Sequence, residues 1–196
     1  MKRAYILIIF LAILIPIHAQ GGFQQFFNES MSTNRTGMYV LGGWALANLA
    51  TGATGWAKAD GSAKYFHQMN FFWNTVNLGI AGYSFYAFSQ MEPLRMSPQE
   101  LMDQHMLYEK LFLINAGLDV AYVGTGFLLR HLSAANKKRP DMLKGYGSSL
   151  VLQGGFLFLF DGVMYFIQRD NRLDFLGDMH LGLVPGGAVL RFAHLF

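Results

Sequence analysis

Four long stretches of the chain are nearly free of charged residues, and this pattern constrains the fold more than any other. They are residues 37–57, 65–90, 111–130 and 146–168. Each is close to the roughly 20 residues that a helix needs to cross a bilayer. They are too long for the strands of a membrane barrel, and they lack strict alternation of apolar and polar residues. We therefore expect an all-α membrane protein with a bundle of four transmembrane helices over residues 37–170.

The composition agrees with a membrane protein. Hydrophobic residues make up 53% of the chain and charged residues 14%, whereas a soluble domain carries about a quarter charged residues. The absence of cysteine excludes disulfides, thiolate catalysis and cysteine-held metal sites. The net charge of +3 comes from Lys and Arg residues in short loops beside apolar segments. These residues are expected to set the topology, with the lipid bilayer as partner and no nucleic acid bound.

The first 19 residues have the three parts of a secretory signal peptide. Lys2 and Arg3 precede a short apolar core, and Ala19 offers a cleavage site. An uncleaved anchor helix is the alternative. Residues 20–36, which are polar and aromatic, are expected to form an exported N-terminal arm.

Loop charges predict the orientation of the helices. The linker between the first and second helices carries Lys58 and Lys64, and the linker between the third and fourth carries several basic residues over positions 130–144. Loops rich in Lys and Arg stay in the cytoplasm, so both linkers are expected there. After signal cleavage, the N-terminus and the C-terminus are both expected on the outer side.

The linker between the second and third helices contains a helix-start signal. Ser97 is the expected N-cap, Pro98 the first helical residue and Glu100 the capping-box partner. A helix that begins there is expected to run unbroken into the third transmembrane helix. Beyond the fourth helix, residues 171–196 are expected to form an exported tail, whose Pro-Gly-Gly segment fits a short β-hairpin.

The chain also contains a candidate internal duplication. The stretch "ALANLATGATGW" at 45–56 aligns with "AGLDVAYVGTGF" at 116–127, so that Asn48 falls on Asp119. The second and fourth helices show a weaker likeness. We interpret the bundle as two tandem helical hairpins, which often place a site at their interface near mid-membrane. The alternative is convergence, because small residues recur wherever membrane helices approach closely.

Polar residues near the middle of the four helices form the candidate site. At helical spacing they build one polar stripe on each helix, which predicts that the stripes face a common buried axis. Two carboxylates at one depth repel when both are ionised, so at least one is expected to hold its proton. The candidate residues are Asn48, Asn74, Asn77, Asn115, Asp119, Tyr122, Asp161 and Tyr165.

Two interpretations of this polar set remain open. It is either a proton-handling or cation-handling pair at the floor of a small-molecule cavity, or a hydrogen-bond network that holds the helices together. The histidines are weaker candidates. His105 and Glu109 lie one turn apart, and a metal site with His180 and His194 would need three or more of these residues to converge, so surface histidines are expected instead. No catalytic motif is found, and we expect no enzyme activity, no cofactor and no metal.

The segments "NAGLDVAYVGTGFLL" and "LKGYGSSLVLQGGFLFLFD", together with the leading signal, carry a resemblance to a known family. They resemble uncharacterised four-helix integral membrane proteins of bacteria, a domain of unknown function found mostly in Bacteroidota. The resemblance covers about residues 36–170. Its distinctive residues are Asn115, Gly117, Asp119, Tyr122, Gly145, Tyr146, Gly147, Gln153, Gly154 and Asp161. It implies a bacterial membrane protein and supplies no activity. From the helical spans and the leading signal, we expect a multi-pass protein of the bacterial inner membrane.

The sequence therefore favours an integral membrane protein whose polar core binds or conducts a small solute or ion. The alternative is a structural or assembly protein that binds other membrane proteins, or a second copy of itself, through its helix faces and exported segments.

Overall fold

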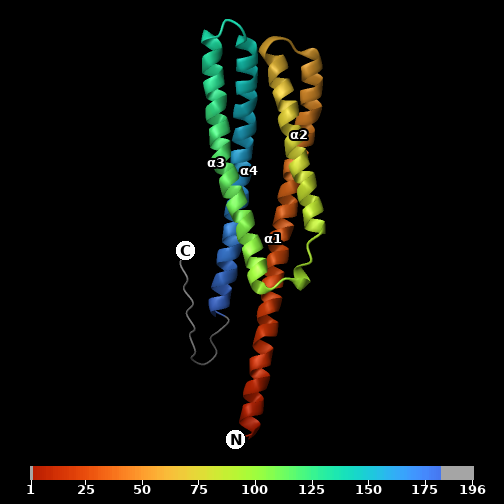
Figure 1. Ribbon diagram of the computed structural model, residues 1–196, viewed down its shortest axis with the longest axis vertical. Helices are drawn as coiled ribbons and strands as arrows, with labels where there is room; N and C mark the ends of the chain where they lie inside the picture. The colour runs from red at the N-terminus through yellow and green to blue at the C-terminus, as the bar shows by residue number, and fades with distance from the viewer. Residues whose placement is uncertain (1, 182–196) are drawn as a thin grey trace.

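The computed structural model describes residues 2–181, with side chains described for residues 22–177, and this part of the chain is entirely helical. Two antiparallel hairpins stand side by side, one formed by α1 and α2 and the other by α3 and α4 (Figure 1). Both hairpin turns lie at the same end of the molecule. The expectation of an all-α chain with four long helices is confirmed. The elements are α1 (Lys2–Lys58), α2 (Gly61–Ser89), the short 3-10 helix η1 (Pro93–Arg95), α3 (Pro98–Ala135) and α4 (Pro140–Leu181).

The helices extend beyond the charge-poor runs from which they were predicted. Residues 22–36, which belong to the expected N-terminal arm, are helical and continue α1, and Phe27 and Ser30 are fully buried there. Together with Asn34 and Met38, these residues follow steps of three and four, which keeps one face of α1 against the bundle. Residues 171–181 likewise continue α4, and nearly all of the expected β-hairpin lies outside the described residues.

The start of α3 confirms the predicted capping box. The Ser97 hydroxyl accepts a hydrogen bond from the Glu100 backbone N–H at 3.3 Å, and the Glu100 carboxylate accepts one from the Ser97 backbone N–H at 2.7 Å. Pro98 occupies the first turn, where its missing N–H costs nothing. From this start α3 runs unbroken for 38 residues, a length of about 57 Å at 1.5 Å per residue.

Glycines set the distance between paired helices. A Cβ atom built on Gly126 of α3 would lie 2.7 Å from the backbone oxygen of Gly147 of α4. In the first hairpin, a Cβ on Gly52 of α1 would lie 3.1 Å from the backbone nitrogen of Phe71 of α2. Such contacts let backbones approach where larger residues would hold them apart. Unrelated pairs of helices also make close contacts at glycines, so these contacts do not establish a common origin of the two hairpins. The internal duplication stays a prediction.

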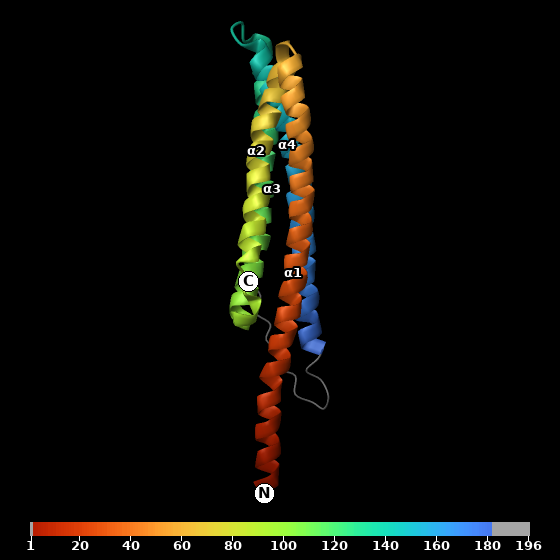
Figure 2. The ribbon, with the colours of Figure 1, turned by 90° about the vertical axis from the view of Figure 1, so that its right-hand side faces the viewer.

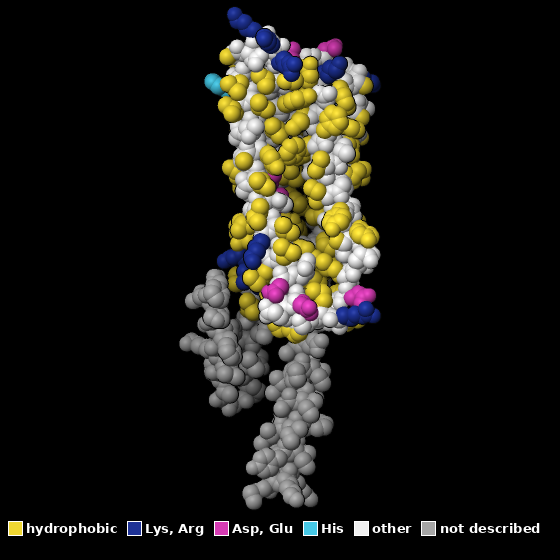
Figure 3. All heavy atoms as spheres, viewed as in Figure 1, with side chains coloured by type: hydrophobic (Ala, Val, Ile, Leu, Met, Phe, Trp, Pro, Cys, Tyr) yellow, Lys and Arg dark blue, Asp and Glu magenta, His cyan; other side chains and the backbone are white. Residues whose placement is uncertain are grey.

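The bundle buries many polar side chains beside its hydrophobic core and exposes many large apolar ones. Amide, hydroxyl and carboxyl side chains are buried between the helices, whereas many large apolar side chains on all four helices are exposed. Figure 3 shows the apolar side chains over the whole middle of one face, with the charged side chains gathered at its two ends. Within residues 36–57, 65–91, 111–129 and 145–168, the charged side chains are Asp119 and Asp161 alone, and both are buried.

Length and hydropathy nevertheless support two membrane spans and not the expected four. Among the described residues, these are α3 over Pro98–Ala135 and α4 over Pro140–Gly177. The reason is visible in α2, whose Asn70, Asn74 and Asn77 all point into the bundle. Amide side chains lower the mean hydropathy of a helix whichever way they face. The mean hydropathy of α2 is therefore too low to indicate a membrane span, although its outer surface is apolar.

Candidate functional site

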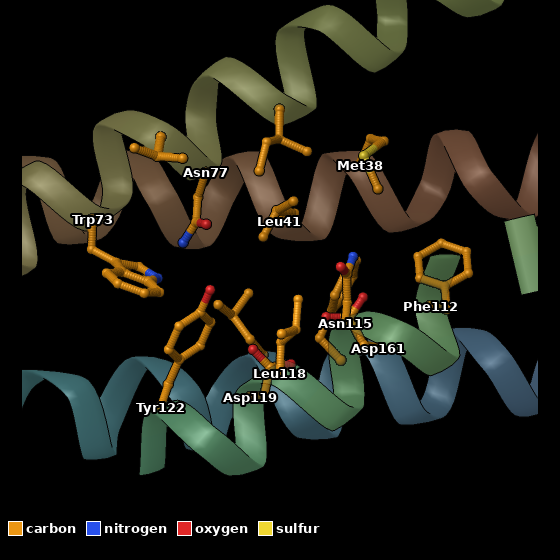
Figure 4. Close-up of a pocket in the computed structure, with 14 residues that line it drawn as sticks. Met38, Leu41, Trp73, Asn77, Phe112, Asn115, Leu118, Asp119, Tyr122 and Asp161 are labelled. Atoms are coloured by element: carbon orange, nitrogen blue, oxygen red, sulfur yellow. The ribbon is translucent and has the colours of Figure 1, made fainter. Parts of the chain in front are cut away.

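A cavity of about 250 Å³ lies between the two hairpins, with lining residues from all four long helices (Figure 4). Most of its wall is apolar, with Leu41 from α1, Ile80 from α2 and Phe160 from α4 among the contributors. Its polar lining is Asn77 from α2, Asn115, Asp119 and Tyr122 from α3, and Asp161 from α4.

Asp119 and Asp161 meet inside this cavity. The two side chains are hydrogen-bonding partners, and Asn115 is a second partner of Asp161. They are nearly inaccessible, at 2% and 5% exposure. Two carboxyl groups form a hydrogen bond with each other only when one of them carries a proton.

The close approach of α3 and α4 at Gly154 brings the two acids together. A Cβ atom on Gly154 would lie 3.0 Å from the backbone oxygen of Asp119 and 3.2 Å from the Cβ of Tyr122. A larger residue would therefore push this turn of α3 away from α4. The glycine allows the carboxyl groups to meet across the helix interface.

Asp119 is also incompletely satisfied. Among the described residues, no N–H or O–H donor contacts its Oδ2 atom, which is fully buried. An unpartnered buried polar atom costs about 1–3 kcal/mol. Apart from a proton shared with Asp161, the described residues offer this oxygen no hydrogen-bond donor, although the Asp119 side chain lines the cavity.

An amide network fills the bundle between this cavity and the end with the hairpin turns. Asn70 donates to Asn48 Oδ1 at 2.7 Å, Gln153 donates to Asn70 Oδ1, and Trp44 donates to Gln153 Oε1 at 2.9 Å. Asn74 donates to the Asn70 backbone oxygen at 2.8 Å. The network thus ties α1, α2 and α4 together.

The structure divides the predicted site residues into three groups. Asn77, Asn115, Asp119, Tyr122 and Asp161 line the cavity, as the common buried axis predicts. Asn48 and Asn74 are buried as expected, but they belong to the amide network and do not line the cavity.

Tyr165 does not join either polar group. It follows Asp161 by one turn of α4, which carries it about 6 Å along the helix axis, and it packs against the hydrophobic core. Sharing a helix face with Asp161 did not imply sharing a cavity.

A second polar cluster, absent from the predicted site, lies near the opposite end of the bundle. His105 of α3 is fully buried; its Nδ1 lies 2.8 Å from Ser30 Oγ of α1, and its Nε2 lies 2.9 Å from Glu109. Arg172 of α4 donates to both carboxylate oxygens of Glu109, at 2.6 and 3.1 Å. Gln168 donates to the Ser30 backbone oxygen at 3.1 Å. We call these five residues the outer cluster.

Electrostatics explain how Glu109 remains ionised there. Burial raises the pKa of its carboxyl, but hydrogen bonds from His105 and Arg172, together with the positive charge of Arg172, outweigh burial and hold that pKa below its ordinary value of 4.5. The same contact raises the pKa of the Arg172 guanidinium. The outer cluster is therefore a buried ion pair with hydrogen bonds across three helices.

The expectation that His105 lies on the surface is wrong. The sequence holds two partial signals for its burial: Glu109 follows one turn later, and Gln168 and Arg172 are spaced by four residues on another helix. Among the residues that the structure describes, no three His, Asp or Glu side chains come together in a metal-binding group. The His180 and His194 side chains lie outside the described part of the chain.

Comparisons with known proteins place this architecture in a family without assigning an activity. The profile of a family of unknown function, DUF6992, matches residues 40–162. The match includes every polar residue that lines the cavity, whereas Ser30, Gln168 and Arg172 of the outer cluster fall outside it. No curated protein and no solved structure matches the chain. Because the matched segment covers more than half of the chain, the protein belongs to the DUF6992 family.

Proposed function

We propose that the protein is a four-span membrane protein of the bacterial inner membrane whose cavity binds a small cation or small polar solute at Asp119 and Asp161. The proposal of four spans rests on the exposed surface. Large apolar side chains such as Val40 and Leu46 on α1, and Val76 and Tyr83 on α2, are each more than half exposed. A monomeric soluble protein rarely exposes a contiguous apolar patch larger than a few hundred Å².

The distribution of loop charges supports the orientation. The two hairpin turns, which carry Lys58, Lys64 and the basic residues of 130–144, lie together at one end of the molecule (Figure 1). Basic loops favour the cytoplasmic side. The outer cluster and the start of α3 then lie toward the other side of the membrane.

One observation carries the proposed binding function: the buried Asp119 and Asp161 side chains line a cavity, and one Asp119 oxygen finds no hydrogen-bond donor among the described residues. A polar network that serves only to hold helices together would satisfy its members, because an unsatisfied polar group is costly in a low-dielectric interior. The polar lining consists of carboxyl, amide and phenol groups without a basic side chain. Such a lining suits a cation or a hydrogen-bond donor and disfavours an anion.

Benzylamine, which is a cation in neutral water, is a suitable probe because it is soluble and its ring matches the apolar wall. Isothermal titration calorimetry on the full chain in lipid nanodiscs should detect its binding. Benzyl alcohol, which has the same shape but no charge, should bind at least about tenfold more weakly, a difference of about 1.4 kcal/mol. Asp119→Asn and Asp161→Asn should each reduce benzylamine binding by at least the same factor.

Asp103→Asn serves as the matched control, because Asp103 is an exposed acid on the same helix outside the cavity. It should leave benzylamine binding unchanged. Equal binding of benzylamine by the wild type and both cavity variants would refute the proposed function and leave the assembly role as the better account.

A further inference from the structure

The cavity opens sideways, between α2 and α3. α1 packs on α2, α3 on α4, and α2 on α4, but α2 and α3 form no comparable interface. Figure 3 shows the molecule hollowed on this face, with acidic atoms visible inside the gap. The rim is formed by Val76 and Ile80 on α2, at 62% and 49% exposure, and by Leu118 on α3, at 48%.

Aromatic pairs close this opening toward both ends of the bundle. On the side of the hairpin turns, Trp73 of α2 meets Tyr122 of α3 edge-on, with ring centroids 4.8 Å apart (Figure 4). On the other side, Phe88 of α2 meets Tyr108 of α3, with centroids 6.1 Å apart. The opening is therefore a window in the flank of the bundle and not a channel from one end to the other.

In the four-span arrangement this window faces the hydrocarbon of the bilayer. Its rim lies within the charge-poor runs 65–90 and 111–130, and its rim residues Val76, Ile80 and Leu118 are apolar. A ligand that uses it must first dissolve in the membrane. An isolated charge does so poorly, because a charged group in hydrocarbon costs several kcal/mol.

The chemistry at the end of the window is acidic. Asp119 and Asp161 face the cavity with the amides of Asn77 and Asn115, and Tyr122 is the only other titratable group in the lining. An amine reconciles this acidic site with an apolar approach, since its neutral form partitions into lipid and its protonated form binds carboxylates. The rings of Trp73 and Tyr122 would add attraction for the resulting ammonium.

We infer that the site takes lipophilic amines, which reach Asp119 and Asp161 from the bilayer through the window between α2 and α3. This inference rests on the proposed binding function and names its ligand class and its route. The amine arrives as a neutral base and takes one proton from the carboxyl pair when both carboxyls are protonated. The products are an ammonium ion and a carboxylate that stays hydrogen-bonded to the remaining carboxylic acid. Net charge in the site is zero before and after the transfer.

The size of the cavity fits the head of such a molecule. A volume of about 250 Å³ equals the liquid volume of about eight water molecules, which accommodates an amine group and a few carbons. A longer chain would extend through the window along the rim and into the surrounding lipid.

The test compares amines that differ in their access to the bilayer. Decylamine, decanol and methylammonium are titrated into the full chain in nanodiscs, and competition with radiolabelled decylamine reports binding. Decylamine should bind at least tenfold more tightly than either of the others, and Asp119→Asn should remove its preference over decanol.

The route is tested at the rim. Ile80→Trp should slow decylamine association at least tenfold by narrowing the window, whereas Val120→Trp is its control. Val120 is also apolar and 58% exposed, but it does not line the cavity. The thermal unfolding temperature of both variants establishes that they fold.

Two results would overturn the inference in distinguishable ways. If methylammonium binds as tightly as decylamine, depends on Asp119 and is unaffected by Ile80→Trp, the proposed site stands, but its ligand comes from water and the inference is wrong. If neither amine shows any dependence on Asp119 or Asp161, the inference and the proposed function fail together.

Discussion

The protein buries acidic side chains in two places, and their surroundings differ sharply. In the outer cluster, Glu109 receives two hydrogen bonds from Arg172 and lies 2.9 Å from His105. In the cavity, one Asp119 oxygen finds no donor among the described residues, and the side-chain partner of that carboxyl there is another acid, Asp161. Glu109 therefore has hydrogen-bond partners for both of its carboxylate oxygens, whereas the Asp119 side chain lines a cavity with one oxygen unpaired among the described residues.

This difference separates structure from function. A charge that is fully paired between helices contributes to stability through its partners, and removing one partner leaves the other exposed to the full cost of burial. The charge of a buried carboxyl without such partners does not stabilise the folded protein. We propose that this carboxyl serves ligand binding at the cavity.

The largest expected effect is the loss of the outer ion pair. Glu109→Gln removes the charge that Arg172 pairs with, and breaking a buried pair costs about 3–5 kcal/mol. The Arg172 side chain is 24% exposed, so water compensates part of the loss and we expect a cost near 3 kcal/mol. Denaturant unfolding of the purified protein measures it. If Glu109→Gln is as stable as the wild type, the outer cluster does not stabilise the fold, and the proposed difference between the two acidic regions is wrong.

Acid should reproduce part of the same loss. The pKa of Glu109 is lower in the folded protein than its ordinary value of 4.5, so its stabilisation is complete above about pH 4.5 and disappears as the pH falls through the folded-state pKa. The difference in unfolding temperature between wild type and Glu109→Gln should therefore shrink below about pH 4.5. A difference that stays constant down to pH 3 would contradict this assignment.

The cavity should be sensitive to the distance between its helices. Gly154→Val places atoms against the backbone of Asp119, and overpacking of this kind costs about 1–3 kcal/mol. It should also weaken benzylamine binding by separating the two acids. Gly155→Val is the matched control, because a Cβ at Gly155 has no neighbour within 4 Å. Equal effects of the two substitutions on binding would show that the helix contact does not shape the site.

The smallest expected effect on stability is at the acid pair itself. Asp119→Asn keeps the shape of the side chain and supplies a donor, so unfolding free energy should change by less than about 1 kcal/mol. Any pH dependence of ligand binding should disappear with it. Denaturant unfolding and pH-dependent calorimetry provide the two readouts. If Asp119→Asn unfolds the protein, the cavity acids are needed for stability just as the outer cluster is, and the proposed difference between the two regions is wrong.

Local sequence patterns predicted much of this architecture. The charge-poor runs located the four helices, and the Ser97–Glu100 capping box was predicted from four residues and confirmed. The pairing of Asp119 with Asp161 followed from their matched positions along antiparallel helices. In each case a signal of local spacing was sufficient.

The rest depended on distant parts of the chain. His105 is buried because Ser30 and Gln168, 75 and 63 residues away, supply its contacts, and no local pattern around His105 carries that information. α1 continues through residue 36 without a break, because residues such as Phe27 before this point are buried on one face of the helix. The polar composition of the segment gave no sign of this buried face. The cavity itself arises where the backbones of α2 and α3 stay apart between two aromatic contacts, which is a property of packing and not of either helix alone.

The most direct test of the central claim is the stabilisation that benzylamine confers on three forms of the protein. A ligand present at 100 times its dissociation constant adds about 2.7 kcal/mol to the free energy of unfolding. We expect this increment in the wild type and equally in Glu109→Gln, despite the lower starting stability of that variant. The double variant Asp119→Asn, Asp161→Asn should show no increment. If the double variant is stabilised as much as the wild type, or if Glu109→Gln alone loses the increment, the cavity acids are not the binding site.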